Sequence, residues 1–124
     1  MTDLCFLTIA EASRQIAARK LSPVELTRAF LERIERYDAG LNAYILVTAD
    51  KAMADARRAE AEIMAGRSRG PLHGIPIALK DIYNTAGIAT TAHSALFKDH
   101  VPAEDAVTTR LLAEAGTVLL GKTA

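Results

Sequence analysis

The chain has 124 residues, half of them hydrophobic, and its 15 basic side chains balance 15 acidic ones. So high an apolar content excludes a disordered tail, and the lack of excess positive charge argues against direct nucleic-acid binding. The apolar runs are far shorter than the roughly 20 residues of a membrane span, and Asp3 stands where a signal peptide carries bases. The single cysteine, Cys5, excludes an intramolecular disulfide. We expect a cytoplasmic protein without a membrane partner.

The amino-terminal half is predicted to be mostly helical. Thr8–Glu11 and Ser22–Glu25 both fit a capping box, in which side chains at the helix start bind free backbone N–H groups. Gly66 is expected to stop an Ala-rich helix. These signals predict helices over about 9–19, 23–37 and 49–65, with a short strand or extended connection over 43–47.

The second half predicts a strand, a loop, a helix and another strand. Residues 75–79 have strand length, and Pro76 within them favours an edge or irregular strand. Asp105 is expected to cap a helix over about 106–115, and residues 117–120 form a second buried-type strand. Such a crossover places helices over parallel strands.

The expected fold class is therefore α/β, with amino-terminal helices packed on a β-sheet. Within one domain portion spanning residues 1–124, we expect a helical part over 1–66 and a strand-helix-strand part over 74–121.

Lys80 is the residue whose position favours chemistry. Side chains alternate along a strand, so the strand's isoleucines and leucine share one face, while Lys80 shares the other with Pro76 and Ala78. Ligands bind at the carboxyl ends of strands in open α/β sheets. Burial favours a neutral lysine, which can act as a general base or nucleophile. Alternatively, Lys80 reaches solvent or pairs with Asp81, for which we favour a structural role binding backbone N–H groups in the loop.

Other motifs give weaker indications. Gly121-Lys122-Thr123 has the ending of a phosphate loop, but a strand pattern separates it from Gly116, where a loop is required. The three histidines are too scattered for a helical metal pair, and adjacent His93 and Ser94 rarely give the geometry of a catalytic pair. We therefore expect no metal and no organic cofactor.

Several segments in order resemble the amidase signature family. Gly70–Asp81 strongly resembles the family's lysine-bearing segment, and Thr90–Ser94 is similar to its Thr-Thr-x-Gly-Ser stretch. The resemblance covers nearly the whole chain. The other matching segments are Ser22–Leu26 and Leu41–Tyr44 among the amino-terminal helices, and Asp105–Leu111, Ala115–Gly116 and Gly121–Thr123 after the loop.

The resemblance implies that the amino-terminal helices pack on part of a mixed β-sheet. It also implies an amidase that hydrolyses a carboxylic amide C–N bond with a Ser–cis-Ser–Lys triad. Lys80 would be its catalytic lysine, taking a proton through a bridging serine so that a second serine can attack the amide carbonyl. The substrate would be a small-molecule amide in the intact enzyme.

Two residues depart from the family pattern. His93 stands where the family often has glycine, and Ala124 where it often has asparagine. The family's two serines follow the Gly-Lys-Thr strand in a Gly/Ser-rich segment, which does not occur before Ala124. We therefore expect an amino-terminal amidase fragment that has no activity alone. Unpaired strand edges favour its self-association.

Two alternatives stay open. One is the amidase-type subunit of a tRNA-dependent amidotransferase, which would act on glutamine and need a partner protein. His93 and Ala124 favour the free-standing enzyme over it. The other is a non-catalytic binding or interaction module of the same fold.

Overall fold

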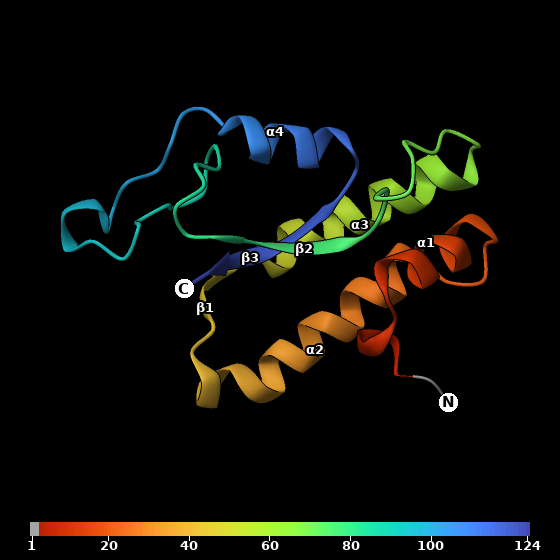
Figure 1. The fold of residues 1–124 in the computed structure, drawn as a ribbon, viewed down its shortest axis with the longest axis horizontal. Coiled ribbons are helices and arrows are strands. Elements are labelled where there is room, and N and C mark those ends of the chain that lie inside the picture. Colours follow the sequence, from red (N-terminus) through yellow and green to blue (C-terminus); the bar gives the residue numbers. More distant parts are fainter. Residues whose placement is uncertain (1–2) are drawn as a thin grey trace.

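A computed structural model describes residues 3–124 and shows helices around a small sheet (Figure 1). The described part is mixed α/β, as the sequence predicts. Its elements are η1 (Leu4–Phe6), α1 (Ile9–Ala17), α2 (Pro23–Leu41), β1 (Tyr44–Val47), α3 (Ala49–Met64), β2 (Pro76–Lys80), η2 (Ala95–Phe97), α4 (Val107–Glu114) and β3 (Val118–Thr123).

Helices α1 and α2 begin at the two predicted capping boxes. The Thr8 and Ser22 side chains cap the two helices, and each box has its reciprocal glutamate bond. Helix α2 continues past the predicted end at Tyr37, through Gly40, and stops at Asn42. Asn42 adopts a left-handed conformation with φ 53°, and its N–H donates to the Asp38 carbonyl at 2.7 Å. Asparagine tolerates this conformation better than most residues, which makes it an effective helix stop.

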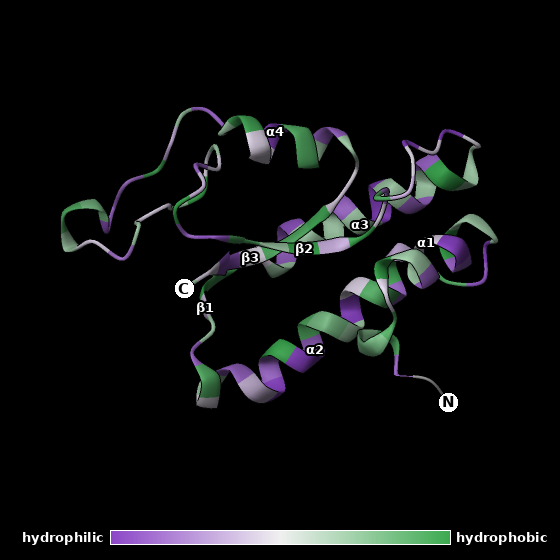
Figure 2. Cartoon of the chain, viewed as in Figure 1, coloured by the Kyte–Doolittle hydropathy of each residue, from purple (hydrophilic) through white to green (hydrophobic). Residues whose placement is uncertain are grey.

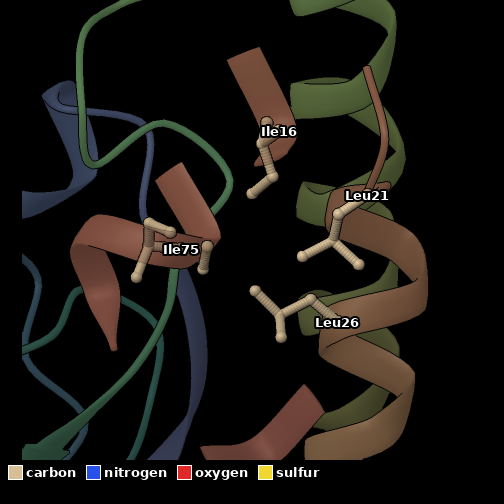
Figure 3. Close-up of a cluster of buried hydrophobic side chains, with 5 residues drawn as sticks. Ile16, Leu21, Leu26 and Ile75 are labelled. Carbon is tan, nitrogen blue, oxygen red and sulfur yellow. The ribbon is translucent and has the colours of Figure 1, made fainter. Parts of the chain in front are cut away.

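A hydrophobic cluster joins α1, α2 and the segment that leads into β2. Ile16, Leu21, Leu26 and Ile75 are its large buried members, and their side chains point toward one another (Figure 3). Ile75 packs in this cluster, whereas Ile77 lines a cavity under α4 together with Leu79, so our expectation that Ile75 and Ile77 share a face is wrong. The cluster anchors the start of β2 to the helices.

The three strands of the described chain form one mixed sheet in the order β1-β3-β2. Strand β3 pairs antiparallel with β1 and parallel with β2. The parallel pairing confirms the predicted strand-helix-strand crossover through α4. Strand β2 lies at an edge of the sheet, as Pro76 predicted, because proline cannot donate to a ladder. Its pairing register with β3 shifts between Ile77 and Ala78.

Helices lie on both sides of the sheet. Ala52 and Ala56 of α3 pack against Val118 and Leu120 of β3 together with α2, whereas α4 lies on the opposite side from α2 (Figure 1). Hydrophobic and hydrophilic residues alternate around α2 (Figure 2), as expected of a helix with one packed face. None of the helices in residues 3–124 combines the length and hydropathy that crossing a bilayer requires.

Two predictions near the carboxyl end are corrected. The prediction that Asp105 caps α4 is wrong: the residue before this helix is Ala106, which gives no side-chain cap. The Asp105 carboxylate instead accepts the Ala86 N–H at 2.7 Å. Strand β3 continues past Leu120 to Thr123, because its neighbours pair with these last residues. Gly121-Lys122-Thr123 therefore lies within a strand, which excludes a phosphate loop.

Candidate active site

Lys80 is the last residue of β2, at the carboxyl end of a parallel strand pair. It pairs with Thr123 of β3, and the N–H of the next residue, Asp81, donates to the Thr123 carbonyl at 2.8 Å. The Lys80 side chain is exposed, as is Ala78 on the same face. The burial considered for Lys80 is therefore not found, because the described residues leave that face of the edge strand open. Its exposure matches the alternative in which Lys80 reaches solvent.

Asp81 holds the loop that follows Lys80. Its carboxylate is buried, accepts the Thr91 N–H at 3.1 Å through each oxygen, and also accepts the Thr91 hydroxyl. Its backbone carbonyl accepts the Ala92 N–H at 2.8 Å. The predicted structural role of Asp81 is confirmed. These bonds hold the two ends of the loop together immediately after Lys80.

The buried lysine of the sheet is Lys122, which sequence reasoning missed. Its side chain has 0% exposure. Its Nζ donates to the Tyr83 carbonyl at 2.6 Å, to the Thr85 hydroxyl at 2.9 Å and to the Thr90 hydroxyl at 2.8 Å. The available signal was a Gly-Lys-Thr run directly after three apolar strand residues, a pattern that a continuing strand also gives.

The hydrogen bonds around Lys122 fit a charged ammonium. Thr85 Oγ1 donates to the Tyr83 carbonyl and Thr90 Oγ1 donates to the Ile88 carbonyl, so both hydroxyls offer only lone pairs to Nζ. Three acceptors match the three hydrogens of an ammonium, whereas a neutral amine has two. Burial lowers the pKa of Lys122, and the carboxylates of Asp81 and Asp105 oppose that effect.

The histidines have local roles. His73 is buried, its Nδ1 accepts the Arg69 N–H at 3.0 Å, and its Nε2 lies 2.9 Å from a Glu62 carboxylate oxygen. His93 is exposed with φ 58°, and the Ser94 hydroxyl caps η2 by accepting the Leu96 N–H. Within the described residues there is no cluster of three or more His, Cys, Asp or Glu side chains suited to a metal ion.

Lys80 lines neither of the two cavities that lie beside α1 and under α4. One of about 420 Å³ opens between α1, α2 and α3, beside Leu21 and Ile63. Another of about 230 Å³ lies under α4 and is lined by Ile77, Leu79 and Leu119 on the other face of the sheet. The candidate site is therefore an open sheet edge with Lys80 at its end, not an enclosed pocket.

Comparison with known proteins decides the family. A family model described as Amidase matches residues 25–124. The chain belongs to the amidase family. It is 47% identical over 123 residues to a glutamyl-tRNA(Gln) amidotransferase subunit of Dehalococcoides mccartyi, covering 99% of this chain and 25% of that relative. The chain thus spans about a quarter of the length of this curated relative.

Solved amidase structures share the fold. A peptide amidase in complex with the inhibitor chymostatin superimposes with a TM-score of 0.91 and 38% identity, over 98% of this chain and 25% of that one. A fatty acid amide hydrolase gives a TM-score of 0.92 and 30% identity, over 98% of this chain and 21% of that one. The arrangement of helices and mixed sheet is therefore that of amidase signature enzymes, as the resemblance implied.

Proposed function

We propose that the chain is part of an enzyme that hydrolyses a carboxylic amide, with Lys80 as the catalytic lysine of a Ser–cis-Ser–Lys triad. One observation carries the proposal. In this amidase-family chain, the segment that resembles the family's lysine-bearing motif forms a strand, and Lys80 is the last residue of that strand, at the carboxyl edge of the sheet. Ligands of open α/β sheets bind at this edge.

The geometry suits proton transfer by Lys80. Its backbone is fixed on one side by pairing with Thr123 and on the other by the bonds of Asp81, while its side chain extends from the open face beside Ala78. A bridging serine placed on that face would hand its proton to the amine as the nucleophilic serine attacks the carbonyl. The amine would later return a proton toward the leaving amine. The substrate is a small-molecule amide.

We further propose that residues 1–124 are the amino-terminal part of one amidase domain and do not hydrolyse amides alone. The serine hydroxyls that have partners bind elsewhere: Ser22 donates to Glu60 at 2.6 Å, Ser68 accepts the Gly70 N–H, and Ser94 caps η2. Ser13 lies within α1, remote from β2 in the chain. None of these positions supplies a nucleophile held against Lys80.

A second candidate is the amidase-type subunit of a tRNA-dependent amidotransferase. The observation that favours it is the 47% identity to one such amidotransferase protein, over nearly all of this chain. The two candidates differ in the amide and in the partner. Assaying the enzyme that carries this chain with glutamine, with and without the other amidotransferase subunits, separates them: the second candidate requires the partner, and the free-standing amidase does not.

A chimera tests the proposed role of Lys80. Residues 1–124 replace the matching quarter of the peptide amidase, whose fold they share, and hydrolysis of a peptide amide is measured. Lys80→Ala should lower kcat/KM by about 100-fold or more, the usual contribution of a general base. Lys20→Ala, which removes an exposed lysine in the α1–α2 turn, is the matched control and should leave the rate nearly unchanged. Full activity in the Lys80→Ala chimera would refute the proposal.

A further inference from the structure

We propose that Lys122 is a positioning residue for the Lys80 site, because its buried amine fixes the loop of residues 81–91 against β3. The inference rests on the proposed function of Lys80. Lys122 lies on the strand next to β2, paired with Leu79, one residue before Lys80. It does not contact the reacting atoms and acts through the loop.

An irregularity in β3 directs Lys122 toward this loop. Ile77 pairs with Leu119 but Ala78 pairs with Gly121, so Leu120 is an extra residue in β3. Val118 and Leu120 pack on α3, and strict alternation would also turn Lys122 toward α3. The extra residue reverses the alternation and turns Lys122 to the face of its pair, Leu79, which lines the cavity under α4.

All three acceptors of the Lys122 amine come from the loop. They are the Tyr83 carbonyl and the Thr85 and Thr90 hydroxyls, 32 to 39 residues away in sequence. Both threonines are buried with it, at 4% exposure. Bonds from a charged donor to buried acceptors are stronger than neutral ones, so this single side chain fixes both ends of the loop.

The loop transmits this constraint to Lys80. Thr90, held by Lys122, precedes Thr91, whose N–H and hydroxyl bind the Asp81 carboxylate. Asp81 follows Lys80 directly and is tied to β3 through the Thr123 carbonyl. Loosening the Thr90 end of the loop would therefore release Asp81 and let the backbone at Lys80 move.

Packing alone does not account for a lysine at this position. Removing an ammonium from water is costly, and an apolar side chain of similar volume fills a core without that cost. The Lys122 hydrogen bonds bring a benefit that an apolar residue lacks: they order a polar loop beside the candidate site. The effect to be tested is therefore local order at residues 81–92 and the rate of the chemical step.

The first test is amide hydrogen exchange on the chain itself. Lys122→Met keeps the length of the side chain and removes its ammonium. The Thr91 and Ala92 amides, which bind Asp81, should exchange about tenfold faster or more, as expected for loss of a bond to a charged group. The Ala56 amide in α3 should be unchanged, and so should all three amides in the control Lys98→Met, which removes an exposed lysine. Unchanged exchange at Thr91 and Ala92 in Lys122→Met would overturn the proposal.

The second test uses the peptide amidase chimera. Lys122→Met should lower kcat about tenfold while KM stays the same, because a displaced Lys80 slows the chemical step and not substrate binding. An unchanged kcat, or a rise in KM alone, would overturn the positioning role. The exchange test does not depend on turnover, and an active Lys80→Ala chimera would refute the proposed function separately.

A milder variant covers the case in which Lys122→Met fails to fold. Thr90→Val is nearly isosteric and removes one of the three acceptors. Faster exchange at Thr91 and Ala92 with protection of Ala56 retained would support the proposal. Unchanged exchange at Thr91 and Ala92 would overturn it.

Discussion

At the scale of single residues, His73 is a buried imidazole whose neutral form the structure favours. Because Nδ1 accepts the Arg69 N–H, the proton of the neutral ring lies on Nε2, facing Glu62. Burial lowers the pKa of His73 below its ordinary 6.5, although the Glu62 carboxylate opposes the shift. Hydrogen bonding to Arg69 lowers the pKa of Glu62 below 4.5.

Stability should therefore fall on acidification. Between the lowered pKa of folded His73 and 6.5, the unfolded chain binds more protons, so the free energy of unfolding decreases as pH drops below 6.5. Glu62 adds a decrease in the same direction below 4.5. Urea unfolding from neutral pH to about pH 5 measures the first effect, and His73→Gln should flatten it, with His100→Gln as the exposed control. Equal pH dependence in His73→Gln and the unsubstituted chain would contradict this account.

Gly116 is required by the ring of His73. A Cβ on Gly116 would lie 2.3 Å from His73 Cδ2, and its φ of +85° disfavours other residues. Gly66 has a similar φ of +79° but open space around it, so Gly66→Ala is a control for backbone strain alone. We expect Gly116→Ala to lower the free energy of unfolding by about 1–3 kcal/mol more than Gly66→Ala, the usual range for overpacking. If denaturant unfolding gives equal losses of unfolding free energy for the two variants, the His73 ring moves aside without cost and this account is contradicted.

At the scale of elements, local signals predicted the starts of helices and tertiary pairing decided the ends of other elements. The capping boxes before α1 and α2 depend on residues three positions apart, so the sequence contains all the information they need. The length of β3 depends on pairing with both neighbours, and a Cβ on Gly121 would lie 2.2 Å from the Leu46 carbonyl oxygen. Only the assembled sheet shows why this glycine continues a strand.

The same distinction explains the candidate site. The position of Lys80 at the end of a strand, and the structural role of Asp81, follow from local alternation and turn chemistry. Local patterns do not predict which lysine is buried. The surroundings of Lys122 are determined by an extra residue in β3 and by a loop more than 30 residues away in sequence. Local patterns therefore placed Lys80 at the end of its strand but did not show that the buried lysine of the sheet is Lys122.

At the scale of the whole molecule, both outer strands of the sheet present an edge. Strand β1 also exposes Ile45, Leu46 and Val47 at 43%, 37% and 38%. Open edges with apolar side chains favour pairing between chains. We expect the average mass from size-exclusion chromatography with light scattering to rise with protein concentration. Ile45→Lys should reduce this rise, and a constant monomer mass for the unsubstituted chain would contradict the expectation.

Chemical rescue tests most directly whether the Lys80 amine transfers protons. Small primary amines are added to the Lys80→Ala chimera, and the rate of peptide amide hydrolysis is measured at several amine concentrations and pH values. If Lys80 is the base, the rate rises in proportion to the unprotonated amine. A rate that no small amine restores, despite intact folding of the variant, would contradict the assignment.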